Sequence, residues 1–387
     1  MRSEEWYERM AELGEKLGTG VTADDQSAEF SHEKWHLIAA TGLFGLPFTS
    51  DRRRCDQTLP QLTAALEGLG HGSDDASLGF SVATQLASCA VPLARFGSPA
   101  LRERYEHAVT TGRIIGAHAI TEPQAGSDAL AMSTTAVADN DHYVLNGRKA
   151  FISNGPIADL VVVYTVTGQP GTFTGLTAFA VPRDTKGFTL SEPLGKMGLR
   201  CSPLGTAELN DVRVPADHVV GQVGGGSWLL SHVMAREILF IAAGQVGQMR
   251  RRLAACARRA RGRVQFGQPI GAFQAVAHKI VDMRISVETA RKWLHDTTAR
   301  MVAGEDVTAR VAMTKIVVSE ANVATARTAV QVFGGAGYLS STGIERGLRD
   351  AIAGTIYSGT SEIQRNKVAA VMGIGSTDLG ENGGSSW

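Results

Sequence analysis

The run SWLLSHVMAREILFIAAGQVGQMRRRLAACARRARGR, residues 227–263, decides how the second half of this chain folds. Apolar residues recur in it every three or four positions, which is the pattern of one long amphipathic helix. Two further runs with the same period cover residues 275–303 and 307–334. Because long helices must bury their apolar faces against one another, the C-terminal part is predicted to be a helical bundle.

The periodicity changes twice along the chain. Up to about residue 113 it is helical, whereas residues 114 to about 220 contain short β-branched runs such as HYVLNGRKAFIS and DLVVVYTVT, separated by turn residues. No G-x-G-x-x-G lies in a strand–turn–helix setting, so a Rossmann nucleotide site is not supported. The order α, β, α predicts an α+β fold with four parts: helical domain 1–113, β domain 114–225, helical bundle 226–374 and a flexible Gly/Ser-rich tail 375–387.

Composition limits the class of protein. The 387 residues carry 38 Lys+Arg and 38 Asp+Glu, so net charge gives no reason to expect nucleic-acid binding. The four cysteines are far apart and form no C-x-x-C pair, which favours free thiols in a reducing compartment over disulfides or a metal site. The N-terminus is charged, and no apolar stretch approaches eighteen residues. We therefore expect a cytoplasmic globular protein with no metal, membrane or nucleic-acid partner.

Two segments in the β region could contact a ligand. GAHAITEPQAGSDAL, residues 116–130, offers backbone N–H groups, the hydroxyls of Thr121 and Ser127, and little bulk, which suits a planar or anionic ligand. A turn-rich domain linker explains it equally well. GRKAFISNGPIAD, residues 147–159, carries Phe151 in a strand, where a phenylalanine is more often part of the core.

Three segments in the C-terminal half have the same ambiguity. Arg263 and Gln265 precede a tight Phe-Gly turn and could hold a pyrophosphate, or could form a solvated helix end. Gly334-Gly335-x-Gly337 allows close backbone approach to something flat or anionic. GTIYSGTSEIQR, residues 354–365, could be a helix cap, an anion site or a place of chemistry.

Taken together, these segments resemble the acyl-CoA dehydrogenase flavoprotein superfamily across nearly the whole chain. ITEPQAGSD, RVQFGQPIGAFQ, QVFGGAGY and IYSGTSEIQR occur in the family's order and approximate spacing. The resemblance implies an N-terminal helical domain, a middle β-barrel, a C-terminal four-helix bundle and a homotetramer or dimer.

The resemblance also implies bound FAD. Carried over residue by residue, the positions along the isoalloxazine edge and pyrophosphate are His118, Ile120, Thr121 and Ser127. Phe151 and Ser153 would flank the ring, where the family more often has Trp and Thr. Thr360 and Glu362 would lie nearby. The positions that would reach the FAD of a neighbouring subunit are Arg263, Phe266, Gln274, Gln331 and Gly335.

The resemblance implies removal of a proton α to a thioester carbonyl and transfer of the β-hydrogen as hydride to flavin N5. Such a proton is weakly acidic, so the base must be close and desolvated. Many relatives keep a glutamate base at the position of Ser358, which is not a base here. A minority place it on the first long helix of the bundle, and the matching residue is Glu237. It precedes an apolar run, although it could also be an exposed glutamate paired with Arg236.

The motifs most resemble those of the dehydrogenases that oxidise prolyl or related aminoacyl groups on carrier proteins in secondary metabolism, including antibiotic biosynthesis. The alternative is a short- or branched-chain acyl-CoA dehydrogenase that acts on free CoA thioesters. A third possibility is a flavin-binding relative that has lost dehydrogenation. An electron acceptor is expected, and oxidation could stop at two electrons or continue to four. Arg52–Arg54 and residues 249–263 are basic clusters that could meet an acidic carrier or be solvated.

Overall fold

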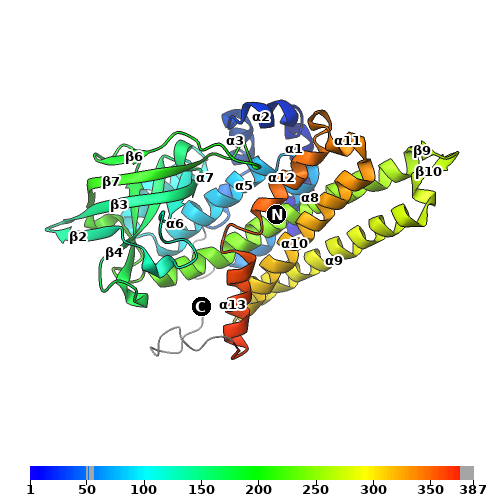
Figure 1. The fold of residues 1–387 in the computed structure, drawn as a ribbon. Coiled ribbons are helices and arrows are strands. Elements are labelled where there is room, and N and C mark those ends of the chain that lie inside the picture. The colour runs from blue at the N-terminus through cyan, green and yellow to red at the C-terminus, as the bar shows by residue number, and fades with distance from the viewer. Residues whose placement is uncertain (49–50, 52–55, 375–387) are drawn as a thin grey trace.

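The computed structural model describes residues 1–48, 51 and 56–374 (Figure 1). The predicted flexible tail, 375–387, and the basic cluster Arg52–Arg54 lie outside the described residues. Along the chain, a helical segment precedes the sheet and a second helical segment follows it, so the α+β fold is confirmed.

The N-terminal domain is a set of helices packed closely enough to require glycine. A Cβ atom on Gly68 would lie 2.2 Å from the carbonyl oxygen of Tyr7, and one on Gly72 would lie 2.0 Å from that of Ala11. Any larger residue would therefore push two helices apart. The helices are α1 (Ser3–Leu17), α2 (Val21–Ser27), α3 (His32–Ala39), α4 (Leu59–Gly72), α5 (Ala76–Gln85), α6 (Val91–Phe96) and α7 (Pro99–Thr110).

The middle domain corrects one detail of the expected architecture. Its strands form one mixed sheet in the order β6-β7-β3-β2-β4-β5-β8, with β1 paired in parallel to β4, and in the described residues this sheet is open rather than a closed barrel. Every residue of β4 is buried, because the sheet is covered on both faces there. The strands are β1 (Gly116–Ala119), β2 (Thr135–Asp139), β3 (His142–Ser153), β4 (Leu160–Val166), β5 (Leu176–Pro182), β6 (Phe188–Leu190), β7 (Leu204–Pro215) and β8 (Val219–Val220).

The C-terminal domain is built on three long helices that run side by side (Figure 1). The opening run of the sequence forms α8 (Gly226–Gly262), and a small hairpin of β9 (Val264–Gln265) and β10 (Gln268–Pro269) leads into α9. The remaining helices are α9 (Gln274–Val302), α10 (Thr308–Phe333), α11 (Gly335–Tyr338), α12 (Ile344–Ala353) and α13 (Ser361–Val371), of which α12 and α13 pack on α10.

Two helical stretches, Ala76–Phe96 and Gly226–Gly262, are long and apolar enough to cross a membrane by composition alone. Their most apolar windows are 89% and 72% buried inside the protein. This burial identifies them as core helices of the fold, with apolar surfaces that face other helices and the sheet.

A buried carboxylate joins three helices of two domains. Glu67 of α4 is 1% exposed and accepts hydrogen bonds from Arg250 of α8 and from Arg291 and His295 of α9, each at 2.8 Å. Burial acts to raise the pKa of Glu67, but the hydrogen bonds and charges of His295 and Arg291 more than offset it and lower the pKa to about 2. The N-terminal domain is therefore held to the bundle by an ionised carboxylate.

The first prediction concerns acid stability. Since the pKa of Glu67 is lower in the folded chain than its usual 4.5, its contribution is fully present above pH 4.5 and is lost as the pH falls toward 2. Glu67→Gln is expected to cost about 1–3 kcal/mol at pH 7, because three partly exposed donors lose the charged acceptor that they share. Urea unfolding between pH 7 and 3 checks both points: the variant should lose less stability on acidification than the parent chain. Parallel pH curves would contradict the assignment.

Candidate active site

Three separate parts of the chain meet at one carboxylate, that of Glu237 on α8. Ser358, in the turn before α13, donates a hydrogen bond to Glu237 Oε1 at 2.5 Å. His118, on β1, places its Nε2 atom 3.3 Å from Glu237 Oε2. Glu237 is 7% exposed. The structure therefore brings the predicted base against the loop position where many relatives keep theirs.

Local sequence explains how each partner is presented. Side chains of a strand alternate between faces, so Ala117 and Ala119 of β1 enter the core of the sheet while His118 points to the opposite side, toward α8. Ser358 has a φ of 52° and Gly359 a φ of 80°, so both are in the left-handed region. This turn ends at Thr360, whose hydroxyl accepts a hydrogen bond from the N–H of Ile363 and caps α13.

Arg236 does not weaken the neighbouring carboxylate by pairing with it. Its guanidinium donates two hydrogen bonds to Asp56, one from Nε to Oδ1 at 2.8 Å and one from Nη2 to Oδ2. Its Nη1 atom donates to the carbonyl of His232 at 2.9 Å. Successive residues of a helix point about 100° apart, which is why Arg236 and Glu237 reach different partners. The pairing of Arg236 with Glu237 that the sequence allowed is therefore absent from this arrangement.

Two buried tyrosines lie near the same carboxylate. Burial, aided by the negative charge of Glu237, raises the pKa of both Tyr164 on β4 and Tyr357 beside Ser358. Both phenols therefore stay protonated. The Tyr357 hydroxyl accepts a hydrogen bond from Gln245 at 2.9 Å, whereas that of Tyr164 finds no partner in the part of the chain that the structure describes.

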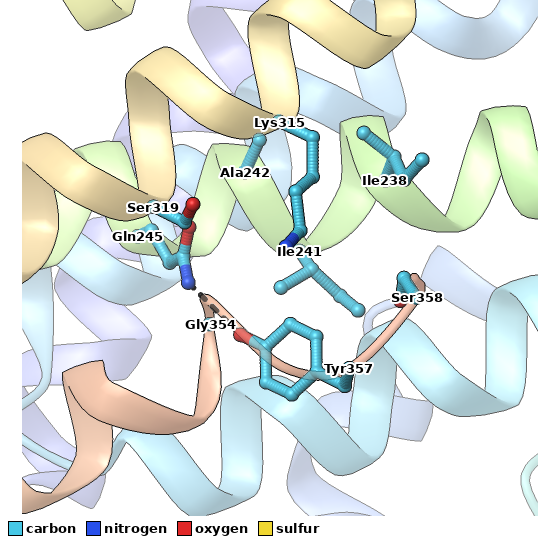
Figure 2. A pocket seen from close by; sticks show the side chains of 9 residues that line it. All are labelled: Ile238, Ile241, Ala242, Gln245, Lys315, Ser319, Gly354, Tyr357 and Ser358. Carbon is cyan, nitrogen blue, oxygen red and sulfur yellow. Dashed lines mark hydrogen bonds between the residues drawn. The ribbon is translucent and has the colours of Figure 1, made fainter. Parts of the chain in front are cut away.

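A shallow recess of about 220 Å³, a volume that includes open solvent, borders Ser358 (Figure 2). Its α8 wall is formed by the apolar Ile238, Ile241 and Ala242 and by the polar Gln245. The Lys315 side chain of α10 reaches into it, and burial lowers the pKa of that amine to about 8. The recess combines apolar side chains with a few polar groups, but it is smaller than the pockets of about 300–1,000 Å³ that bind small molecules.

A fully buried ion pair between Lys149 and Glu122 holds the ITEPQAGSD loop in place. Lys149 Nζ lies 2.9 Å from Glu122 Oε1 and donates to the carbonyl of Ile120 at 3.0 Å. Glu122 also accepts from the N–H groups of Ser133 and Thr134. Burial acts against ionisation of Glu122, but the bonds from Lys149, Thr134 and Ser133 more than offset it and lower its pKa to about 2. The backbone around Thr121 is held as a rigid edge.

A β-bulge beside this loop turns Phe151 outward. The register of β3 on β7 shifts between Lys149 and Ile152, and Phe151 has a φ of 54° and is 65% exposed. The common case of a phenylalanine in the core does not apply here. The N–H of Ala150 donates to the carbonyl of Thr121 at 2.8 Å, so bulge and loop are adjacent. An exposed aromatic ring beside rigid backbone fits a flat ring such as isoalloxazine.

The other positions expected to contact FAD divide into two groups. Thr360 and Glu362 begin α13, close to Ser358. The second group includes Arg263, at the far end of α8. About 26 helical residues at 1.5 Å each place Arg263 about 39 Å from Glu237 along the helix axis. The members of this group are all exposed: Arg263, Phe266, Gln274, Gln331 and Gly335. The structure does not bring this group to the Glu237 site of the same chain.

Sequence reasoning missed several residues of the site. Asp56, Tyr164, Lys149 and Glu122 gave no distinct signal, because their roles depend on contacts between distant segments. The alternation of β3 could not have marked Lys149, because register shifts on both sides of it break the burial pattern of the strand. Among described residues, no cluster of His, Cys, Asp and Glu gathers that could hold a metal ion.

The chain matches the acyl-CoA dehydrogenase N-terminal domain over residues 4–113, the middle domain over 117–212 and the C-terminal domain over 224–373. The chain belongs to the acyl-CoA dehydrogenase family. The predicted family, its fold and the class of FAD-dependent dehydrogenase are thereby confirmed.

Similar proteins include two named L-prolyl-[peptidyl-carrier protein] dehydrogenase. The one from Serratia sp. is 35% identical over 90% of this chain and 90% of its own length, and the one from Pseudomonas fluorescens is 36% identical over 89% and 91%. Among solved structures, the prolyl acyl carrier protein oxidase AnaB is 36% identical with a TM-score of 0.91, covering 96% of this chain and 99% of its own. The FAD complex of PigA is 33% identical, with a TM-score of 0.91, over 96% and 97%.

Acyl-CoA dehydrogenases proper are also similar. The butyryl-CoA dehydrogenase of Megasphaera elsdenii is 30% identical with a TM-score of 0.91, over 96% of this chain and 98% of that structure. Both kinds of thioester dehydrogenase therefore share this fold, and the family alone does not choose between carrier-bound and CoA-bound substrates.

Proposed function

We propose that this protein is an FAD-dependent dehydrogenase that oxidises an aminoacyl thioester, of prolyl type, while it is tethered to a carrier protein in secondary metabolism. The carboxylate of Glu237 carries the proposal: it is buried, separated from Arg236, and set against Ser358 where many relatives have a glutamate. The similarity to L-prolyl-[peptidyl-carrier protein] dehydrogenases supports the substrate class. A cytoplasmic location fits this metabolism.

The residues proposed to hold the cofactor come from β1 and the loop after it, from the end of β3 and from the start of α13. His118, Ile120, Thr121 and Ser127 would follow the isoalloxazine edge and pyrophosphate, with Phe151 and Ser153 beside the ring and Thr360 and Glu362 nearby. When bound, FAD supplies the acceptor for the β-hydride. The rigid loop above Glu122–Lys149 and the outward Phe151 are the features of this chain that suit it.

The protein's own part in the reaction is to move one proton. A Glu237 oxygen would take the α-proton of the thioester, so the α-carbon–hydrogen bond breaks as an oxygen–hydrogen bond forms. Ser358 fixes the other oxygen at 2.5 Å, which limits rotation of the carboxylate. Burial keeps water from competing for the same oxygens.

The direct test compares thioesters of one acyl group. Prolyl carrier protein and prolyl-CoA are each incubated with the purified flavoprotein and an artificial electron acceptor that reoxidises the flavin, and the acyl mass is measured before and after. We expect loss of two or four hydrogens from the carrier-bound group and much slower turnover of the CoA ester. Efficient turnover of CoA esters alone would favour the second candidate, a short- or branched-chain acyl-CoA dehydrogenase, which the butyryl-CoA dehydrogenase similarity supports.

Assembly is part of the proposal. Phe266 is 93% exposed with a φ of 50°, and Tyr338 at the same end of the bundle is 82% exposed. Large exposed aromatic side chains mark interaction surfaces. We propose a homotetramer or dimer in which Arg263, Phe266, Gln274, Gln331 and Gly335 contact the FAD of a neighbouring subunit.

Phe266→Ser is expected to weaken both assembly and FAD binding. Removing an aromatic anchor from an interface costs about 2 kcal/mol or more, so the dissociation constant for FAD should rise at least roughly tenfold. Light scattering after gel filtration and fluorescence titration of the apoprotein measure the two effects. Val137→Ser, at a 64% exposed position on β2, is the matched control. Unchanged mass and unchanged FAD affinity would contradict the shared site.

A further inference from the structure

His118 stands opposite the proposed base rather than in an isolated position on the sheet. Its Nε2 atom lies 3.3 Å from Glu237 Oε2, and the two side chains are 13% and 10% exposed. Its Nδ1 atom is buried and has no hydrogen-bond partner among the described residues. Glu237 is therefore the charged group that lies within reach of the His118 imidazole.

The strand holds this imidazole in place. In the β1–β4 register His118 is paired with Val162, and its neighbours Ala117 and Ala119 are fully buried on the other face. A shift of one residue would turn the histidine into the core of the sheet. His118 is therefore presented by rigid backbone, which is the requirement for a residue that orients another.

The two oxygens of Glu237 face groups from different domains. Oε1 accepts from Ser358 of the C-terminal domain, and Oε2 faces His118 of the middle domain. A glutamate alone can rotate about three bonds, and each rotation would move the oxygens away from a fixed substrate position. Ser358 therefore holds one oxygen by a hydrogen bond, whereas Oε2 has no hydrogen-bond partner among the described residues and faces His118 across 3.3 Å.

The other polar groups around Glu237 act differently. On its own helix, Arg236 is bound to Asp56, and His232 has its pKa lowered to about 3 by burial and by Arg236. From β4 and from the turn before α13, Tyr164 and Tyr357 contribute protonated phenols. His118 is the group that the structure sets against Oε2.

We propose that His118 is a positioning residue for Glu237: its Nε2–H group holds Oε2 in the orientation from which the carboxylate takes the α-proton. This rests on the proposed function, in which Glu237 is the base. At 3.3 Å the contact is longer than a well-aligned hydrogen bond, and such contacts commonly tighten when substrate binds. The competing role for His118 is a contact with the isoalloxazine edge alone.

Two variants separate these roles. His118→Phe keeps the ring shape without the donor, whereas His118→Gln restores an N–H donor. We expect His118→Phe to slow anaerobic flavin reduction by prolyl carrier protein about 10²-fold, since a misplaced catalytic group costs about that much. Substrate KM should stay unchanged, and the deuterium isotope effect at the α-carbon should grow. His118→Gln should regain most of the lost rate.

The coupling to Glu237 supplies the decisive comparison. In the Glu237→Gln background, adding His118→Phe should cause no further loss of rate. The melting temperatures of the four apoproteins (parent, two single variants, double variant) should show non-additive effects. FAD affinity, from fluorescence titration of apoprotein, separates the two roles: any change should be the same in His118→Phe and His118→Gln, whereas only His118→Phe should slow flavin reduction.

Two outcomes would overturn the inference. If His118→Phe reduces flavin as fast as the parent, His118 does not position the base. If both histidine variants bind FAD more weakly and are equally slow, the residue acts on the cofactor. Neither outcome touches the proposed function, which fails separately if Glu237→Gln alone remains active.

Discussion

Glu237→Gln is expected to abolish substrate-driven flavin reduction while leaving the protein folded and yellow. Glutamine has the same shape and can still accept from Ser358, but it has no basic oxygen for the α-proton. Removing a general base typically costs about 10²–10⁴-fold in rate, and the weak acidity of this proton places the expected loss at the upper end. Anaerobic rapid mixing with prolyl carrier protein, followed by flavin bleaching, measures it.

Two controls make this result specific. Glu288→Gln, at a carboxylate of α9 that is 52% exposed and paired with Arg284, should reduce flavin at the parent rate. In Glu237→Gln/Ser358→Glu, the new carboxylate starts from a side chain whose oxygen lies 2.5 Å from Glu237 Oε1, so partial recovery of activity is expected. Full retained activity in Glu237→Gln would show that the base lies elsewhere.

The vacancy at Ser358 led from the sequence to Glu237, and periodicity alone predicted the long helix that carries it. These inferences rest on local pattern and on motif order, both of which are visible in one chain. Closure of the middle sheet is different, because it depends on pairing between strands distant in sequence. The resemblance to the family predicts a closed barrel, and this prediction is wrong for the described sheet, which is open.

The partners of Glu237 could be predicted only in part. The motif predicts His118 as a flavin contact, whereas its approach to α8 follows from the face of β1 on which it lies and from packing between domains. Lys149 was overlooked for a similar reason. The bulge between Lys149 and Ile152 breaks the strand's alternation, so a buried lysine and an outward Phe151 are not evident from period two.

That same lysine gives the second large prediction. Lys149→Met is expected to destabilise the apoprotein by about 3–5 kcal/mol, because Glu122 would remain as a buried charge without its cation. The carbonyl of Ile120 would also lose its donor, so the loop proposed to hold FAD should loosen and bind the cofactor more weakly. Urea unfolding of the apoprotein and FAD titration measure the two effects.

The double variant Glu122→Gln/Lys149→Met distinguishes a lost charge pair from lost packing. Removing both charges leaves no unpaired ion, so the double variant should be more stable than Lys149→Met alone. Lys186→Met, at an exposed position of the same domain, should leave stability nearly unchanged.

Since the pKa of Glu122 is lowered to about 2, the pair's contribution is present above pH 4.5 and is lost toward pH 2. The difference between parent and Lys149→Met should therefore shrink on acidification, and equal stability of single and double variants would refute the buried pair as the support of the flavin loop.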